Sequence, residues 1–387
     1  EKPKNRAAPN HRPNHDRSSR RGSTAPYIGA KLGFRNYWYP ALLSRELADD
    51  RPAAVRMLGE NILLRRIEGQ VFAVQDRCIH RGVRFSRKPE CYTADTITCW
   101  YHGFTYNMRD GKLVEILTEP GSNLRGKLAL RTYPVIETKG IIFVFIGDIQ
   151  PPEIASDVAP GFLDDDLAIN GIRDEVKTNW RIGAENGFDT THIYIHRDSA
   201  LIGGNRIVLP LGLVPNGRHG VVTFTDAEPF GVLDSMFENY QPVFQSRIGE
   251  QIVVESSGAA NEKIIAKQIS IWMPGMLKVD PFPDPEIIQF EWYVPIDAGS
   301  HMYWRVLGKK VRSPAQADTF SEEFRTRWEP LALHAFNDAD IWAREGMQEF
   351  YQDDSAWDQE HLFKPDLCIV EWRKLASRFN RGIQPAP

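Results

Sequence analysis

The sequence predicts an α+β protein of two domains, in which an all-β domain precedes a domain that mixes helices with longer strands. Its 387 residues are enough for two ordinary domains, and 42% hydrophobic with 25% charged residues is a normal globular composition. Short stretches of strand-forming residues separated by tight-turn residues fill positions 28–150, whereas helical apolar patterns occur only beyond them. We therefore expect a small β domain first and a larger mixed domain after it.

Strand pairs joined by short turns account for the first domain. Glu68-Gly69 and Asp110-Gly111 are turn sequences between strand-forming residues, and the second of them favours a two-residue hairpin between Tyr106 and Leu113. Two further predicted strand pairs are Ile62–Arg66 with Gln70–Gln75 and Thr132–Glu137 with Ile141–Ile146. Loops at the ends of such strands can converge on one site.

Pro151-Pro152 marks the expected boundary, so we predict domains over residues 27–153 and 154–387. Residues 1–22 hold seven Lys and Arg against two acids and show no apolar periodicity, which predicts a disordered basic tail over residues 1–26. In the second domain, Gln289–Pro295 and His301–Leu307 read as a hairpin, and Ser321–Tyr351 has a helical pattern that Pro330 interrupts.

Cysteine and histidine pairs in the first domain predict an iron–sulfur cluster. Cys78 with His80 and Cys99 with His102 form a C-x-H and C-x-x-H set. A Rieske [2Fe-2S] cluster needs this donor set, with two thiolates on one iron and two imidazoles on the other. A structural zinc site is the alternative, because Zn²⁺ also accepts two thiolates and two imidazoles. The set predicts a protein that handles single electrons.

Charge and hydropathy exclude other broad classes. A net charge of −4 disfavours a nucleic-acid partner, since phosphates select basic surfaces. No apolar run approaches the roughly 18 residues that span a bilayer, and no secretion signal is present, so we expect no membrane span and a cytoplasmic protein. No glycine fingerprint for a nucleotide follows a predicted strand, so we expect no flavin or nicotinamide to be bound by this chain.

Two histidines in the second domain predict a mononuclear metal site. On a helix, Asp189, His192 and His196 would project from one face. Two imidazoles and one carboxylate leave open positions on Fe(II), where dioxygen and substrate can meet. The third ligand must come from elsewhere, and Asp338 and Asp340 are the two candidates. A helical H-x-x-x-H pair alone is weak evidence, but an electron relay needs an acceptor.

Three segments together resemble the Rieske non-haem iron ring-hydroxylating oxygenases. They are Cys78-Ile79-His80-Arg81-Gly82, Cys99-Trp100-Tyr101-His102 and Asn186-Gly187-Phe188-Asp189-Thr190-Thr191-His192-Ile193-Tyr194-Ile195-His196. The resemblance extends over roughly residues 27–383 and includes Asp340-Ile341-Trp342-Ala343-Arg344-Glu345. It implies an N-terminal Rieske domain and a helix-grip catalytic domain whose curved antiparallel sheet wraps helices over the iron.

The resemblance also implies residue roles. His192, His196 and Asp340 would hold the iron, with Asp338 the weaker alternative. Asp189 would bridge His102 of one subunit to His192 of its neighbour, which requires a ring of subunits, here a homotrimer. A helix N-cap is the structural alternative for Asp189.

Fused aromatic rings with a bridging heteroatom, carbazole first, are the substrates that the resemblance implies. The expected reaction is dioxygenation at the ring-junction carbon and its neighbour. The backbone carbonyl of Gly187 would accept the substrate N–H, and plain core packing is an equal reading for the apolar pocket members. The implied pocket residues are Gly187, Ile269, Leu277, Val279, Phe282, Gln289, Glu291 and Phe336.

Electrons must come from a partner, which the resemblance implies is a ferredoxin reduced by an NAD(P)H-dependent flavoprotein. The basic residues near the cluster could attract an acidic carrier, although a solvated face is the ordinary reading; they are Arg81, Arg84, Arg87 and Lys88. Two other functions stay open at this point. One is a Rieske monooxygenase or demethylase, and the other is a non-enzymatic electron carrier or zinc protein.

Overall fold

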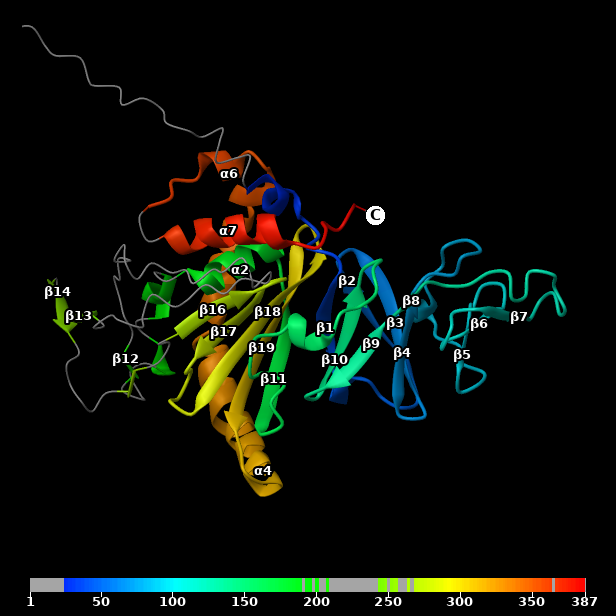
Figure 1. Cartoon of the computed structure of the whole chain (residues 1–387), viewed down its shortest axis with the longest axis horizontal. Helices are drawn as coiled ribbons and strands as arrows, with labels where there is room; N and C mark the ends of the chain where they lie inside the picture. Colours follow the sequence, from blue (N-terminus) through cyan, green and yellow to red (C-terminus); the bar gives the residue numbers. More distant parts are fainter. Residues whose placement is uncertain are drawn as a thin grey trace, which may run out of the picture.

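The computed structural model describes residues 24–189, 192–196, 199–201, 207–208, 243–248, 251–256, 263–264, 268–363 and 366–386. Figure 1 shows a slender all-β part on the right and a broader part of helices around one large sheet on the left. The predicted α+β class is confirmed. The predicted tail over residues 1–26 lies outside the described residues up to residue 23, and a short helix begins at residue 24.

Three antiparallel sheets form the first part of the chain, in the orders β1-β10-β9, β2-β3-β4-β8 and β5-β6-β7. The strands are β1 (Tyr37–Leu43), β2 (Ala53–Met57), β3 (Glu60–Ile67), β4 (Gln70–Gln75), β5 (Thr96–Thr98), β6 (Phe104–Asn107), β7 (Leu113–Ile116), β8 (Thr132–Tyr133), β9 (Val135–Thr138) and β10 (Ile141–Ile146). Short 3-10 turns, η1 (Ser44–Glu46) and η2 (Phe85–Arg87), lie between them.

A five-stranded antiparallel sheet, in the order β11-β19-β18-β17-β16, organises the second part. Its strands are β11 (Leu167–Val176), β16 (Gln268–Trp272), β17 (Met276–Asp280), β18 (Ile287–Asp297) and β19 (Ser300–Lys310); β12 (Ile207–Val208), β13 (Val243–Ile248), β14 (Gln251–Ser256) and β15 (Lys263–Ile264) lie outside it. The helical elements are η3 (Ile154–Ser156), α2 (Trp180–Phe188), η4 (His192–His196), α4 (Pro314–Glu323), η5 (Phe324–His334), α5 (Asp338–Gln348), η6 (Phe350–Gln352), α6 (Ala356–Gln359) and α7 (Leu367–Phe379).

The predicted strands are largely confirmed. β4 and β10 have the predicted bounds, and β18 and β19 form the predicted hairpin with longer strands. Two details of the prediction are wrong. Pro134 divides the predicted strand over residues 132–137 into β8 and β9, because proline has no N–H for the ladder. Tyr106 does pair with Leu113, but residues 108–112 join them as a wider loop than a two-residue turn.

The predicted interruption of the helical segment at Pro330 is wrong. The helix continues through it as η5, which has π-helical hydrogen bonding over residues 324–334. The N–H of Ala335 donates to the Pro330 carbonyl at 3.0 Å, five residues back. A wider turn of this kind accommodates a proline that an α-helix would not.

Helix α2 approaches the large sheet closely through two glycines. A Cβ at Gly183 would lie 2.8 Å from the Tyr293 ring and 2.9 Å from the His301 ring. A Cβ at Gly187 would lie only 1.9 Å from the Tyr293 hydroxyl oxygen. Glycines four residues apart therefore form the face of α2 that meets β18 and β19. This contact therefore positions the C-terminal end of α2 against the sheet.

The main hydrophobic core is continuous across the predicted boundary near residue 153. It joins β1 and β10 to α2 and the large sheet, whereas β5, β6 and β7 have a separate small core. Residues near the C-terminus reinforce this junction. Gln384 donates to the Leu58 carbonyl at 3.2 Å, and Arg381 pairs with the buried Asp157 at 2.8 Å.

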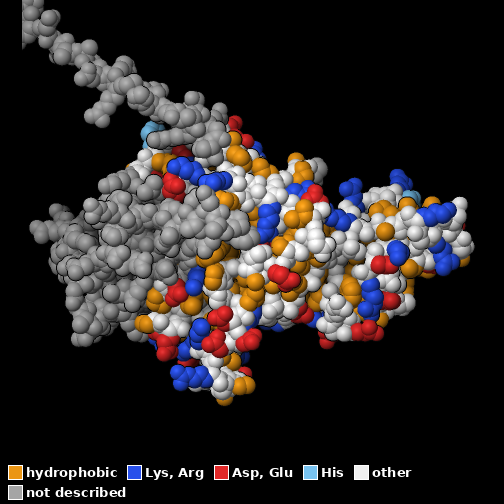
Figure 2. Space-filling view, in the orientation of Figure 1, with side chains coloured by type: hydrophobic (Ala, Val, Ile, Leu, Met, Phe, Trp, Pro, Cys, Tyr) orange, Lys and Arg blue, Asp and Glu red, His pale blue; other side chains and the backbone are white. Residues whose placement is uncertain are grey.

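No described helix is long and apolar enough to cross a membrane. On the face that Figure 2 shows, blue Lys and Arg and red Asp and Glu side chains are interspersed among hydrophobic ones over the described surface.

His301 gives the fold a dependence on pH. The imidazole is fully buried, and burial together with the positive charge of Arg344 lowers its pKa from 6.5 to about 3. Its Nδ1 lies 2.7 Å from the Thr178 carbonyl oxygen, to which a neutral ring donates. The folded chain therefore keeps His301 neutral where an unfolded chain would protonate it.

Acidification between these two pKa values should lower the free energy of unfolding, because the unfolded state binds the proton that the folded state excludes. The contribution of one such group is at most about 1.4 kcal/mol per pH unit. His301→Asn keeps an N–H donor without titrating, so its stability should fall less steeply. Urea unfolding of both proteins at pH 7 and pH 5 measures the loss of unfolding free energy on acidification. An equal loss in the two proteins would contradict the role of His301.

Candidate functional site

Two loops at the end of the slender β part carry the four predicted cluster ligands. Cys78 follows β4, and Cys99 follows β5 directly. The ring centroids of His80 and His102 lie 4.7 Å apart, and the thiols of Cys78 and Cys99 are close enough to interact. The structure therefore brings the four residues together, as the sequence pattern requires.

The two loops share one backbone conformation. In each, the cysteine carbonyl accepts a hydrogen bond from a glycine N–H four residues on, at 2.8 Å for Gly82 and 2.9 Å for Gly103. Both glycines have positive φ, 76° and 73°, which residues with a side chain rarely adopt. In both loops the cysteine N–H also donates, at 2.8 Å, to the residue after the glycine. Each ligand pair is thus held on the same tight turn.

Burial separates the thiols from the imidazoles. Cys78 and Cys99 are buried, whereas His80 is exposed and His102 half-buried. Burial raises the pKa of the Cys78 thiol, and the Tyr106 hydroxyl, 3.4 Å from its sulfur, opposes this. Two thiols inside and two imidazoles outside suit a [2Fe-2S] cluster whose histidine-bound iron lies nearer the surface.

The second site lies where α5 meets the chain that follows α2. Asp340 Oδ1 lies 3.3 Å from Nε2 of His192 and 3.3 Å from Nε2 of His196. Ligand atoms bound at right angles to one ion, about 2.1 Å from it, lie about 3 Å apart. Among the described residues, these three form the one group of His, Cys, Asp and Glu that is spaced to hold a single metal ion. The geometry fits a mononuclear metal with two imidazoles and one carboxylate.

A continuous helix from Asp189 to His196 is not what the structure shows, so that prediction is wrong. α2 ends at Phe188, and Asp189 is extended, with φ −69° and ψ 121°. His192 to His196 form the separate 3-10 turn η4, and residues 190–191 lie outside the described residues. Asp189 therefore stands at the C-terminal end of α2, rather than within one helix with both histidines.

Backbone and amide groups orient two of the three candidate ligand residues, His192 and Asp340. Nδ1 of His192 makes a hydrogen bond to the Asp189 carbonyl oxygen, which leaves Nε2 facing Asp340. Nδ2 of Asn337 donates to Asp340 Oδ2 at 3.1 Å, which leaves Oδ1 for the metal. Partners of this kind fix ring orientation and raise ligand affinity. Asp340 Oδ1 and both nitrogens of His196 have no hydrogen-bond partner among the described residues.

Asp340, rather than Asp338, faces the histidines. Burial alone would raise the pKa of Asp340, but His196, His192 and Arg344 outweigh it and hold that pKa well below its usual range. Asp338 is partly exposed and accepts from Arg305 at 3.2 Å. The structure therefore favours Asp340 as the carboxylate of the site.

A cavity of about 50 Å³, measured as the space open to the centre of a water molecule, lies beside this site. All eight predicted pocket residues line it, together with two of the three metal-site residues and two residues that the sequence analysis did not select. The lining consists of Gly187, His192, Ile269, Leu277, Val279, Phe282, Gln289, Glu291, Phe336, Asn337, Asp340 and Arg344. Apolar walls with a few polar groups are typical of a site for a small aromatic molecule.

Buried polar groups form one wall of the cavity. Glu291 accepts hydrogen bonds from Gln289 and Tyr293, and burial raises the pKa of its carboxyl while Arg344 opposes this. The Gln289 amide nitrogen also lies 3.3 Å from Oδ1 of Asn337. A chain of hydrogen bonds therefore connects Glu291 to the carboxylate of the metal site.

Sequence reasoning missed Asn337 and Arg344. Both lie beside Asp340, and Arg344 is the fifth residue of the segment Asp340-Ile341-Trp342-Ala343-Arg344-Glu345 that carried the resemblance. The i+4 spacing of Arg344 from Asp340 places both on one face of α5. That spacing was the available signal.

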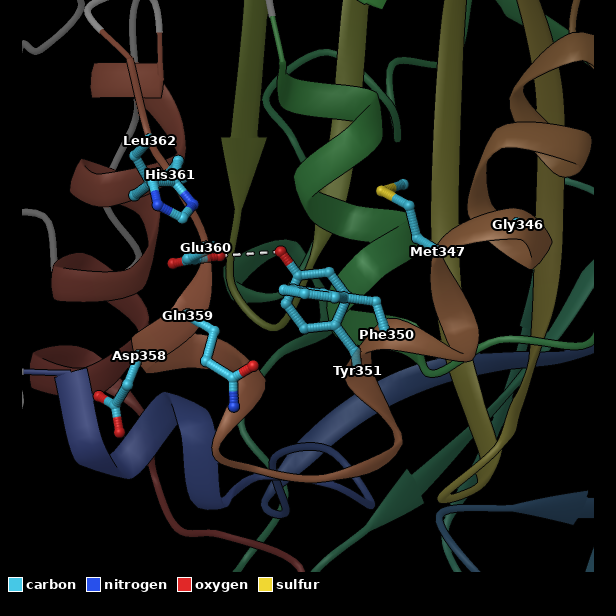
Figure 3. Close-up of a pocket in the computed structure, with 9 residues that line it drawn as sticks. All are labelled: Gly346, Met347, Phe350, Tyr351, Asp358, Gln359, Glu360, His361 and Leu362. Atoms are coloured by element: carbon cyan, nitrogen blue, oxygen red, sulfur yellow. Dashed lines mark hydrogen bonds between the residues drawn. The ribbon is translucent and has the colours of Figure 1, made fainter.

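A second hollow is lined by the end of α5, by Phe350 and Tyr351 of η6 and by residues 358–362 (Figure 3). The Tyr351 hydroxyl points at Glu360 and donates to it at 2.8 Å, and Glu360 also pairs with the buried Arg373. No group of metal-ligand spacing occurs there among the described residues. This hollow therefore lacks the chemistry of the first.

Comparison with known proteins matches both parts of the chain. A family model described as the Rieske [2Fe-2S] domain matches residues 37–134. A second, described as homotrimeric ring hydroxylase, matches residues 145–384. The two models together cover the cluster loops, the metal site and the cavity.

Individual relatives agree. The chain is 53% identical to the terminal oxygenase component of carbazole 1,9a-dioxygenase from Sphingomonas sp., over 93% of this chain and 96% of that protein. The corresponding structure from Novosphingobium sp. KA1 has a TM-score of 0.90 at 50% identity, over 95% of this chain and 99% of that one. A reduced complex between oxygenase and ferredoxin in carbazole 1,9a-dioxygenase matches with a TM-score of 0.88 at 48% identity, over 97% of each chain.

The geometry of the metal site predicts that Asp340→Ala and Asp338→Ala differ in how much mononuclear iron they bind. Asp340→Ala removes a ligand, so mononuclear iron should bind more than about 100-fold more weakly, beyond the cost of losing a supporting group. The visible absorption of the cluster should persist. Asp338→Ala should keep all its iron. Iron and sulfide analysis after anaerobic reconstitution measures both, and iron loss in Asp338→Ala instead would reverse the assignment.

Proposed function

This chain belongs to the homotrimeric ring hydroxylases that carry a Rieske [2Fe-2S] domain, and from that membership we propose that it is the terminal oxygenase of a carbazole dioxygenase system. It is an oxidoreductase that incorporates dioxygen into an aromatic ring. The observation that carries the carbazole assignment is the cavity beside His192 and Asp340, whose walls contain every pocket residue expected of a carbazole oxygenase. Identity of 53% over nearly the whole chain supports it.

Each metal group has its own residues. Cys78, Cys99, His80 and His102 would hold the [2Fe-2S] cluster; His192, His196 and Asp340 would hold the iron. When bound, the cluster supplies single electrons and the iron supplies dioxygen activation. The protein contributes ligands of fixed orientation, because the Asp189 carbonyl and the Asn337 amide hold the far sides of His192 and Asp340.

The cavity would hold carbazole flat between apolar side chains and exclude water from it. Ile269, Leu277 and Phe282 are buried and offer no competing polar atom. The Gly187 carbonyl would accept the carbazole N–H, because Gly187 lines the cavity with its backbone. Val279 and Phe336 complete the apolar walls, and Gln289 and Glu291 the polar one.

The reaction adds two hydroxyl groups to carbazole, at the ring-junction carbon beside nitrogen and at its neighbour. One dioxygen, two electrons and two protons are consumed. The hydroxylated carbon then carries both nitrogen and oxygen, and the carbon–nitrogen bond breaks to give an aminobiphenyl-diol. Because the electrons come from NAD(P)H through a flavoprotein and a ferredoxin, we propose that the protein works in the cytoplasm.

Ferredoxin would dock near the cluster. The basic residues that the sequence analysis selected there are all exposed: Arg81, Arg84, Arg87 and Lys88. Exposed apolar and aromatic side chains beside the cluster, Ile79, Trp100 and Tyr101, supply the contact area that a neighbouring chain can cover. The family is homotrimeric, so we assign the surface beside the cluster, with its basic and its apolar residues, to contacts with a neighbouring subunit and with the ferredoxin.

Asp189 would transmit the electron between subunits, from His102 of one to His192 of the next. Its backbone carbonyl already contacts His192, and its position at the end of α2 is half-buried beside the metal site. A carboxylate between two ligand imidazoles orients both and favours their polarised forms.

Turnover of carbazole tests the proposal. The protein, supplied with a ferredoxin, its reductase and NADH, should convert carbazole to the ring-opened diol with both oxygen atoms from ¹⁸O₂. Mass spectrometry of the product measures the label. A product with one labelled atom would indicate a monooxygenase, and no carbazole product with a colourless, zinc-containing protein would remove the oxygenase assignment.

Asp189→Asn tests the bridge. Turnover should fall by roughly 10- to 100-fold or more, the range for losing a group that supports a metal ligand. Iron and sulfide content should stay unchanged. Asp165→Asn is the matched control, because it makes the same change at an exposed aspartate that lies in neither the metal site nor the cluster loops. Normal turnover in Asp189→Asn would exclude the bridge.

A further inference from the structure

Arg344 is a buried cation in the cavity wall, and its charge favours the ionised forms of Asp340 and Glu291. Only 1% of it is exposed, and it lies one helical turn beyond Asp340 on α5. Burying a guanidinium costs several kcal/mol unless its donors are well used. A methionine of similar volume would fill the same space without that cost. The charge therefore needs an explanation other than packing.

The contacts of Arg344 are directed at α2. Its Nε donates to Oδ1 of Asn186 at 2.6 Å, the best-formed hydrogen bond that it makes. Its guanidinium carbon lies 4.1 Å from the Tyr303 ring centroid and 5.0 Å from that of Tyr293. Nη2 is 4.0 Å from Glu291 Oε2, too far for a direct hydrogen bond. Arg344 thus packs against both tyrosine rings with its Nε held on Asn186.

Asn186 is where this contact acts on the site. It directly precedes Gly187, whose backbone lines the cavity, and its carbonyl accepts from the Asp189 N–H at 3.2 Å. Tyr293 restrains the same turn from the other side, because its hydroxyl occupies the place that a Gly187 side chain would need. The last turn of α2 is therefore held between Arg344 on α5 and Tyr293 on β18.

This arrangement ties two elements that the site must keep in register. α5 supplies Asp340, and the end of α2 supplies the Gly187 carbonyl and leads to His192. A change in the distance between them would move the substrate-holding carbonyl relative to the metal. Misplacement of about 1 Å is enough to lower a rate by roughly 100-fold.

We propose that Arg344 is a positioning residue, which through Asn186 sets the place of the Gly187 carbonyl and so selects substrates that carry an N–H donor. The inference rests on the proposed function and adds the residue pair that enforces it. It concerns recognition of the N–H group, and iron content and cluster absorption are measured separately.

Paired substrates provide the test, with the reconstituted system of oxygenase, ferredoxin and reductase. Carbazole has the N–H, whereas dibenzofuran has an oxygen in its place. In Arg344→Met, KM for carbazole should rise roughly three- to tenfold, the worth of about one net hydrogen bond, and KM for dibenzofuran should stay within about twofold. Iron content and cluster absorption should match the wild type.

Asn186 variants separate positioning from folding. Asn186→Leu removes the acceptor and should reproduce the Arg344→Met values, and it keeps the test open if Arg344→Met folds poorly. Asn186→Asp keeps an oxygen acceptor and should retain the wild-type preference. The double variant Arg344→Met with Asn186→Leu should be no worse than either single one, because both break the same contact.

Arg181→Met is the matched control. Arg181 is a buried arginine at the opposite end of α2 and has no contact with the cavity. It should lose stability with an unchanged ratio of the two KM values. Two results would overturn the inference. One is an unchanged ratio of the KM values for carbazole and dibenzofuran in Arg344→Met, and the other is additive effects in the double variant. No carbazole product from the wild type would instead reject the proposed substrate, and the inference with it.

Discussion

The close packing of α2 on the large sheet is the contact on which the rest of the site depends. Gly183 and Gly187 allow the helix backbone to meet Tyr293 and His301 with no side chain between. Glycine has no Cβ, so it permits this close approach of a helix to a sheet. Because the helix is fixed so near β18, its end delivers Asp189 and the following histidine to the carboxylate of α5.

Burial and hydrogen bonding then prepare the donor atoms. The far side of each of two ligand residues is occupied by a protein group, whereas Asp340 Oδ1 and the His196 nitrogens keep no partner within the described ranges. Unpaired buried polar atoms are costly, so a cluster of them at metal-ligand distances indicates that a cation compensates them. In the first part of the chain, Gly82 and Gly103 give both cysteine loops the same backbone conformation, which places the cluster ligands.

Much of this could be predicted from the sequence, because the informative features are local. Strands β4 and β10 follow from apolar and β-branched runs, and the ligand residues follow from spacing. The break after Phe188 could not be predicted, since the pattern of Asp189 and the two histidines fits a helix equally well. Asn337 and Arg344 were missed because their importance comes from groups brought to them by folding, such as Asn186. Pro330 predicted an interruption of the helical pattern, but a wider helical turn accommodates the proline ring there.

The contacts of the last residues have a mechanical consequence. Gln384 donates to the Leu58 carbonyl and Arg381 donates to the Asn36 carbonyl, both in the first part of the chain, and the main core continues through the same junction. A hinge between the sheet β1-β10-β9 and the catalytic part would have to break these bonds and open that core. Cys78 and Cys99 belong to the separate small core, so bending within one protomer is confined to the strands that lead from this junction to the cluster loops.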